Sequence, residues 1–154
     1  MKNNEELFEP IFRRLRFKES LKHIPNSINK LLDLGCGPRI PFYHFLKSNR
    51  VNIDKYYGFD PLLNEHEISQ NPNSSNIVLV KKQVSDLEKF EDNSVDIVTG
   101  FAFLEHIENP SYVINQSIRI LKPGVGKAIF TTPTKIAKPI LEFLAFKLHL
   151  VSAR

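Results

Sequence analysis

Short aliphatic runs alternate with helix-like segments from residue 30 onward, and this alternation restricts the fold more than any other feature. The runs at 30–34, 55–60, 76–84, 95–100 and 126–133 have the length and composition of buried strands. Segments of helical spacing follow at 40–49, 111–121 and 139–151. Strands joined through helices predict a parallel sheet covered on both faces. We therefore expect an α/β three-layer sandwich with a mainly parallel sheet.

The length of 154 residues and the absence of a linker or repeat predict a single domain over 1–154. Residues 1–28 form an N-terminal extension in which 4–23 has the pattern of an amphipathic helix. A basic cluster, RRLRFK at 13–18, is interpreted as a solvated face of this helix. The apolar positions near helical spacing are Leu7, Phe8, Ile11, Phe12, Leu15 and Leu21.

Charge, cysteine content and hydropathy argue against several classes of protein. Apart from the cluster at 13–18, the residues that give the net charge of +4 are mostly scattered, which gives no support for a nucleic-acid substrate. Cys36 is the single cysteine, so no intramolecular disulfide forms. Neither an apolar signal-peptide core nor a run of about 20 apolar residues is present. We expect a cytoplasmic protein without a transmembrane segment, and the lack of HExxH or paired CxxC spacing predicts no metal.

The sequence LLDLGCGP at 31–38 ends the first strand on two glycines, Gly35 and Gly37. Glycine lets a ligand approach the backbone, and the following helix offers free N–H groups to an anionic or polar group. Two nucleotide-binding patterns fit poorly. The dinucleotide pattern GxGxxG fails at Ile40, which argues against an NAD-dependent enzyme, and no GxxxxGK[ST] occurs.

Asp60 ends the second strand in the sequence YYGFD. An acid at this place can accept hydrogen bonds from both hydroxyls of a ribose. Because Pro61 follows it, Asp60 could also serve only as a turn former. The glycine loop and this acid together predict a nucleoside-containing ligand.

Four segments in order, LLDLGCGP, YYGFD, DNSVDIVTGFAFLEHIENP and ILKPGVGKAIFTTP, resemble the class I S-adenosylmethionine-dependent methyltransferases. The resemblance covers about residues 30–133, the expected cofactor-binding core. It implies a Rossmann-like fold, S-adenosyl-L-methionine as cofactor, and methyl transfer. The expected acceptor is a small molecule or a glycan. The alternative is a catalytically incomplete cofactor-binding module or partner subunit.

The resemblance also implies roles for individual residues. Gly35 and Gly37, with Cys36 between them, would lie under the methionine part of the cofactor, and Asp33 would help to fix its amino group. Asp60 would hold the ribose. The expected adenine contacts after the third strand are Val84, Ser85 and Asp86, although Asp86 could equally be a surface acid or a helix cap. Phe101 and Ala102 would line the methionine side of the pocket.

Glu105 and His106 follow the fourth strand, close to the expected position of the transferred methyl group. A hydroxyl acceptor would benefit from a general base there, and the ordinary pKa of histidine suits that role. His106 is therefore the candidate catalytic residue. A structural or cofactor-pocket role for His106 is the alternative, and Glu105 is interpreted as an acid that orients the loop.

The sequence departs from the family pattern at its C-terminal end. The family has two further strands, whereas this chain ends one helix, at 139–151, after the fifth strand. The fold is therefore expected to be truncated, with the fifth strand as an edge and an apolar helix beside it. We expect a homodimer, or a partner that covers this helix and the sheet edge.

Overall fold

The computed structural model describes residues 4–64, 76–81 and 84–132, and in the first helix it describes the side chains of Pro10 and of residues 12–21. Residues 65–75, between the second and third predicted strands, and the whole predicted helix at 139–151 lie outside the described residues. The helices are α1 (Asn4–Leu21), α2 (Pro41–Ser48) and α4 (Pro110–Ile120), with short 3-10 helices η1 (Val84–Lys89) and η2 (Leu104–His106). The strands are β1 (Ser27–Leu34), β2 (Asn52–Phe59), β3 (Ile77–Val80), β4 (Ile97–Phe101) and β5 (Lys127–Thr131).

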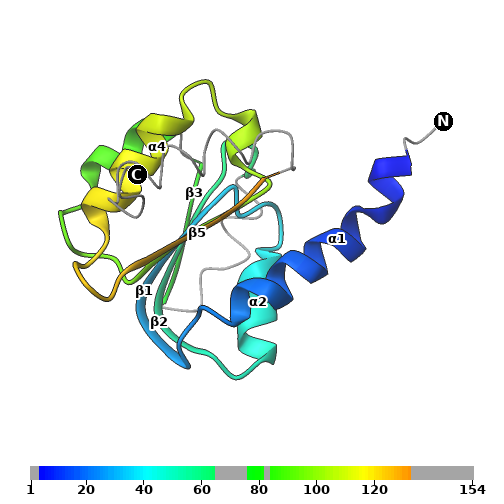
Figure 1. Cartoon of the computed structure of the whole chain (residues 1–154), viewed down its shortest axis with the longest axis horizontal. Coiled ribbons are helices and arrows are strands. Elements are labelled where there is room, and N and C mark those ends of the chain that lie inside the picture. The colour runs from blue at the N-terminus through cyan, green and yellow to red at the C-terminus, as the bar shows by residue number, and fades with distance from the viewer. Residues whose placement is uncertain (1–3, 65–75, 82–83, 133–154) are drawn as a thin grey trace, which may run out of the picture.

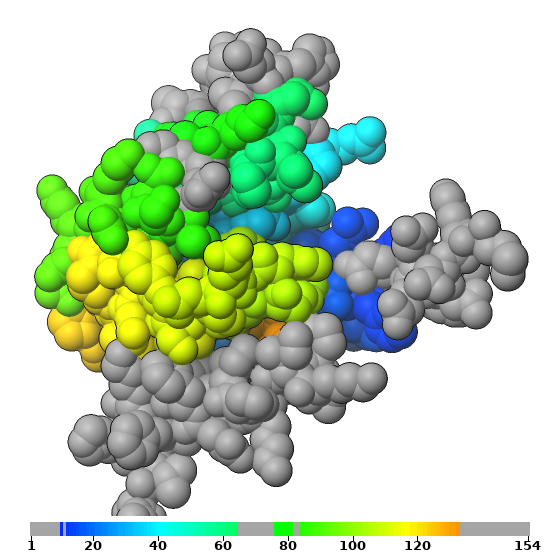
Figure 2. All heavy atoms as spheres, turned by 90° about the horizontal axis from the view of Figure 1, so that it is seen from above, coloured from blue at the N-terminus to red at the C-terminus, as the bar shows by residue number. Residues whose placement is uncertain are grey.

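The described strands form one sheet in the order β3-β2-β1-β4-β5, and every neighbouring pair is parallel. Figure 1 shows α1 and α2 on one face of this sheet and α4 on the other. In Figure 2, α4 in yellow and the segment after β4 in yellow-green cover that second face. The predicted Rossmann-like α/β sandwich with a parallel sheet is confirmed.

Alternating side chains of the central strand build the two halves of the core. Leu31 of β1 packs in the half that contains α2, whereas Leu32 and Leu34 pack in the half that contains α4. Successive residues of a strand point to opposite faces, so the aliphatic run KLLDL is buried on both. This double burial explains why the run contains no exposed residue after Lys30.

Helix α4 begins and ends as its sequence predicts. The side chain of Asn109 caps it by accepting a hydrogen bond from the Tyr112 N–H over 3.0 Å, and Pro110 occupies its first turn. Its buried positions recur at helical spacing: Val113, Ile114, Ser117 and Ile120. The helix thereby supports the loop after β4, which carries candidate site residues.

Two elements differ from the expectation. The strand predicted at 76–84 is only four residues long, because the chain after residue 83 forms η1 and buries Leu87 there. In α1 the predicted apolar positions Phe12 and Leu15 are 51% and 56% exposed. The helix instead buries Phe17, whose ring packs against Phe42 of α2.

At the edges of the described sheet lie β3 and β5. The proposed apolar patch beside β5 depends on residues 139–151, so the homodimer or covering partner stays a prediction. In the described part of the chain, none of the helices has the length and hydropathy needed to cross a membrane.

Candidate functional site

The candidate site lies at the carboxyl ends of β1 and β4, two neighbouring strands inside the sheet. The strand order changes direction between them, because β2 and β3 follow β1 on one side whereas β4 and β5 lie on the other. Loops that diverge at such a point leave a crevice in which ligands bind. The loops here are 35–40 and 102–109.

The loop after β1 is a tight turn, and no other residue that the structure describes covers its backbone at Gly37. Gly35 and Gly37 have φ values of 70° and 66°, which residues with a Cβ rarely adopt. The Gly35 N–H donates to the carbonyl oxygen of Phe59 over 2.8 Å and so ties the loop to β2. A Cβ added to Gly37 would meet no atom within 4 Å. The backbone at Gly37 is therefore accessible to a ligand.

Asp60, the first residue after β2, fixes the same loop. Its Oδ2 accepts a hydrogen bond from the Gly37 N–H over 2.9 Å, and its Oδ1 accepts one from the Leu62 N–H over 2.8 Å. The residue is 9% exposed. A carboxylate offers about four lone-pair positions, so two remain for the donors of a ligand. The two predicted cofactor elements, the glycine loop and Asp60, are thus physically joined.

Asp33 lies buried beneath the glycine loop, at the end of β1. Its two oxygens accept hydrogen bonds from the Tyr56 hydroxyl over 2.6 Å and from the Thr99 hydroxyl over 2.7 Å. Burial raises the pKa of Asp33 to about 6, against the opposing effect of these two bonds, and the charge of Asp60 raises it further. Asp33 is therefore a carboxyl group that changes charge near neutral pH.

A cavity of about 380 Å³, here called the polar cavity, opens between the two loops and α1. Three aromatic rings in mutual contact line one part of it, and their centroids are 4.5 to 4.9 Å apart: Phe17, Phe42 and Phe101. The charged or titratable residues that line it are Arg13, Arg16, Asp33, Glu105 and His106. Gly35, Cys36, Gly37 and Ala102 complete the part of the lining that the sequence predicted.

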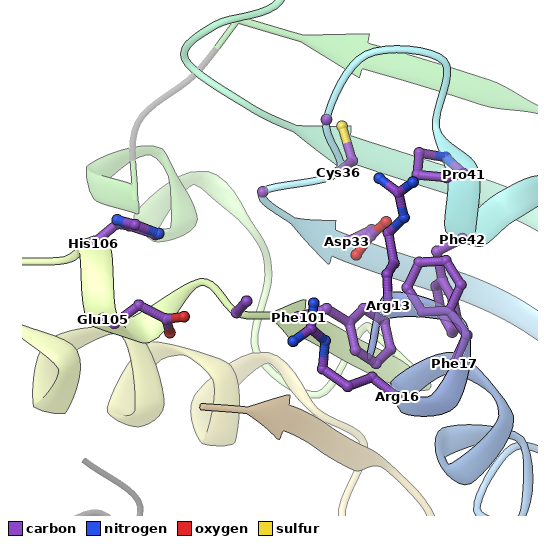
Figure 3. Close-up of a pocket in the computed structure, with 13 residues that line it drawn as sticks. Arg13, Arg16, Phe17, Asp33, Cys36, Pro41, Phe42, Phe101, Glu105 and His106 are labelled. Carbon is purple, nitrogen blue, oxygen red and sulfur yellow. The ribbon is translucent and has the colours of Figure 1, made fainter. Parts of the chain in front are cut away.

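Figure 3 shows how the two arginines of α1 enter the polar cavity. The guanidinium of Arg13 extends toward Asp33 and the loop of Cys36, whereas that of Arg16 extends toward the side of Glu105. Both belong to the basic cluster that the sequence analysis interpreted as a solvated face. Arg16 is half-buried beside Phe17, so that interpretation is wrong for Arg16. Arg13 and Arg14 are exposed as interpreted, although Arg13 also lines the cavity.

A second cavity of about 440 Å³, here called the apolar cavity, lies on the α4 side of the same loops. Its lining includes Phe59, Pro61, Val84, Phe103 and Tyr112, which can enclose a flat ring. His106 lines both cavities, so the two are adjacent. The ring of Phe103 also lies over Gly35, since a Cβ there would be 2.8 Å from the Cδ2 atom of Phe103.

The predicted residues after β3 have different surroundings. Val84 lines the apolar cavity, whereas Ser85 is exposed. Asp86 forms an ion pair with Lys89, 2.6 Å apart, and lines neither cavity. Cys36 is 3% exposed, and its sulfur packs against Gly58, so it combines a packing role with its place in the lining.

Sequence reasoning missed Arg13, Arg16 and Phe103 as residues of the site. Arg13 and Arg16 are three residues apart in the sequence, and this spacing places both side chains on one side of a helix. Which side of the helix faces the sheet depends on tertiary packing, so it could not be predicted from the sequence of the helix alone. Among the residues that the structure describes, no group of three potential metal ligands occurs.

Comparison with known proteins gives a consistent match. A family model described as "Methyltransferase domain" matches residues 4–147, which include both site loops and the arginines of α1. A ubiquinone biosynthesis O-methyltransferase of Acinetobacter baumannii is 27% identical over 112 residues, covering 73% of this chain and 47% of that protein. The chain spans about half the length of the curated relatives it matches.

Solved structures show the same fold. An S-adenosylmethionine-dependent methyltransferase from Mesorhizobium loti has 20% identity and a TM-score of 0.58, covering 75% of this chain and 52% of that one. A chain from the complex of the Haloferax volcanii Trm112 methyltransferase activator has 22% identity and a TM-score of 0.62, with coverages of 82% and 55%. Both likenesses show a shared fold, and in each this chain covers about half of the other chain.

Proposed function

The chain belongs to the class I S-adenosylmethionine-dependent methyltransferase family, and from this membership we propose that it binds S-adenosylmethionine and transfers its methyl group to a small-molecule or glycan-type acceptor. The observation that carries the proposal is the bond between Asp60 and Gly37. One carboxylate holds the open glycine loop and keeps lone pairs for a ribose. The ribose and amino-acid ends of one ligand can therefore be bound together.

The remaining groups fit the other parts of the cofactor. In the polar cavity, Asp33 offers a carboxylate to the amino group of the methionine part, and Arg13, on the same side, offers a guanidinium to its carboxylate. Phe101 and Ala102 line the cavity beside them. In the apolar cavity, Phe59 and Phe103 can stack against adenine, and Val84 can pack against it. Ser85 and Asp86 remain predicted adenine contacts that lie beside this cavity along the chain.

When bound, S-adenosylmethionine supplies a methyl group whose bond to the sulfonium sulfur breaks with both electrons passing to sulfur, while a lone pair of the acceptor forms the new bond. The chain mainly supplies alignment and a site shielded from water. His106, which borders both cavities, can take the proton that leaves the acceptor on a ring nitrogen.

Replacing His106 with alanine is expected to lower the rate of methyl transfer to a hydroxyl acceptor by about 100-fold or more, the usual contribution of a general base. The affinity for S-adenosylhomocysteine should change by less than about twofold. His44→Ala is the matched control, because His44 is exposed on α2 and lines neither cavity. Equal transfer rates for the two variants would show that His106 is not a catalytic residue.

The proposal is tested by calorimetric titration with S-adenosylmethionine and S-adenosylhomocysteine, followed by transfer of a tritiated methyl group to panels of phenols, amines and sugars. Saturable binding and transfer support it. A folded protein that binds neither compound would require the proposal to be withdrawn.

A cofactor-binding module without its own turnover is the second candidate function. One observation favours it: a chain of similar fold comes from the complex of the Haloferax volcanii Trm112 methyltransferase activator. Binding of S-adenosylmethionine without transfer to any acceptor of the panels would support this candidate over the enzyme.

The affinity for S-adenosylmethionine is expected to fall as the pH decreases below about 6, approaching tenfold per pH unit, because Asp33 must be ionised to meet a cationic amino group. The free protein should show the opposite trend. The pKa of Asp33 is higher in the folded state than its ordinary 3.8, so its contribution to stability is complete below pH 3.8 and is lost as the pH rises through 6. Calorimetry and thermal unfolding between pH 5 and pH 8 measure both, and Asp33→Asn should flatten both profiles.

A further inference from the structure

The lining of the apolar cavity comes from segments that lie far apart in the sequence. Val84, at the start of η1, contributes to it from one side, and Asn109 and Tyr112 contribute from the start of α4. Helix α4 packs beside η1, as the yellow and green atoms of Figure 2 show. The inference below rests on the proposed function, in which this cavity holds adenine. It concerns the residues of α4 that fix this part of the cavity.

Tyr112 is held in place by two hydrogen bonds. Its backbone N–H donates to the Asn109 side chain over 3.0 Å, and its hydroxyl donates to Oε1 of Glu88 in η1 over 2.7 Å. The residue between these two bonds lines the apolar cavity. An aromatic ring whose orientation is fixed in this way is a preformed surface on which a flat base can stack.

Arg119 provides a second connection between α4 and η1. It lies seven residues after Tyr112, about two turns further along the same face of the helix. Its guanidinium donates to the carbonyl oxygens of Leu87 and Phe90, over 2.9 Å in both cases. Leu87 lies in the last turn of η1 and Phe90 directly follows it, where a helix leaves carbonyl groups without partners. Arg119 therefore caps the end of η1.

The guanidinium of Arg119 is itself held on α4. Its Nε–H donates to the side chain of Gln116, three residues earlier, over 2.7 Å. Because the guanidinium is planar and rigid, this bond also directs the donors that reach η1. The group pairs with Asp92 as well, but that carboxylate is 67% exposed, and exposed ion pairs contribute little. The bonds to the two carbonyl groups are thus the ones that position η1.

We propose that Tyr112 is a binding residue for the adenine of the cofactor, and that Arg119 is a positioning residue that holds η1, with Val84, beside it. The ring of Tyr112 contacts the base directly. Arg119 contacts no ligand and acts through η1. Both residues lie on α4, so this helix fixes the adenine side of the site in addition to supporting the loop after β4.

Calorimetric titration with two ligands tests this assignment. The first is S-adenosylhomocysteine, and the second is its uridine analogue, which keeps the ribose and the amino-acid end and has a pyrimidine in place of adenine. The wild-type protein should bind the first at least about tenfold more tightly, because a purine offers a larger surface for stacking. The ratio of the two affinities reports on the base alone, since the rest of the ligand is the same.

Variants of α4 should lower this ratio. Tyr112→Ala and Arg119→Gln are each expected to reduce the affinity for S-adenosylhomocysteine about tenfold and that for the uridine analogue less than about threefold. Tyr112→Phe keeps the ring and loses only the bond to Glu88, so its loss should be smaller, about threefold. Arg13→Gln should weaken both ligands equally, because Arg13 is assigned to the amino-acid end.

Two control variants separate positioning from a general loss of stability. Asp92→Asn removes the charge of the ion pair and leaves both carbonyl bonds of Arg119 in place, so wild-type affinities are expected. Lys122→Gln removes a bond of 2.6 Å to Asp96, and neither residue lines a cavity. This variant should unfold at a lower temperature and keep the wild-type ratio of affinities.

The outcomes distinguish this inference from the proposed function. If the wild-type protein binds both ligands equally, or if Tyr112→Ala and Arg119→Gln keep the wild-type ratio, the assignment of α4 is overturned alone. An equal loss of both affinities in Arg119→Gln would show a purely structural role and would overturn its assignment as a positioning residue. A folded wild-type protein that binds no S-adenosylhomocysteine would overturn both proposals.

Discussion

Replacing Asp60 with alanine is expected to lower the affinity for S-adenosylmethionine by about 100-fold or more. Each hydrogen bond from a ribose hydroxyl to a carboxylate contributes about 1.5–3 kcal/mol, and 1.4 kcal/mol corresponds to a factor of ten. The substitution also leaves the Gly37 and Leu62 N–H groups without their acceptor. The glycine loop would then lose one of the hydrogen bonds that hold it at the end of β2. Calorimetric titration of the variant beside the wild-type protein measures the effect.

Two further variants separate binding from loss of structure. Asp54→Ala is the matched control, because Asp54 is exposed on β2, far along the strand from the site, and its side chain accepts a hydrogen bond from the Asn52 side chain. Its affinity should equal that of the wild type. Asp60→Asn keeps one carbonyl acceptor for the loop but loses the charge, so it should unfold near the wild-type temperature and still bind weakly. Wild-type affinity in Asp60→Ala would contradict the role proposed for this residue.

Most of the fold was predictable because its strands are marked by local composition. The runs around Leu31, Tyr56 and Val98 are buried on both faces of the sheet, so they appear as nearly continuous apolar sequence. The third strand, predicted over 76–84, was predicted too long, because Val84 continues the apolar pattern although it belongs to the 3-10 helix η1. Short apolar runs do not distinguish these two states by periodicity alone.

The orientation of α1 was not predictable from its own residues. Local spacing selects the face that carries Phe12 and Leu15, whereas the structure leaves these two side chains exposed and buries Phe17. Aromatic contacts decide it, because Phe17 packs against Phe42 and Phe101 with centroids 4.9 Å away in both cases. Those contacts bring Arg13 and Arg16 to the cavity. The charged part of the site thus depends on the packing between α1, α2 and β4.

The sequence also identified Asp60 and Gly37 separately without showing that they are bonded. They are 23 residues apart, and the hydrogen bond between them forms because β1 and β2 are parallel neighbours that end at the same edge. Sequence motifs place each residue at a strand end, and only the pairing of the strands brings them together. The same applies to Asp33, whose partners Tyr56 and Thr99 lie on the two strands beside it.

Gly37→Ala is expected to reduce the affinity for S-adenosylmethionine by about 100-fold or more, while Gly124→Ala leaves it unchanged. The two glycines have similar conformations, with φ values of 66° and 75°, and a Cβ at either would meet no atom within 4 Å. An alanine with positive φ costs about 1–2 kcal/mol of stability at both positions. Thermal unfolding should therefore show similar losses.

The two variants differ in the surroundings of the added methyl group. At Gly124, in the turn between α4 and β5, the added methyl group points into solvent-accessible space away from both cavities. At Gly37 it enters the polar cavity, where the amino-acid end of the cofactor is proposed to rest. Calorimetric titration of both variants measures this difference directly. Equal affinities at equal stability would mean that Gly37 serves only the turn, since backbone strain is the same in both proteins.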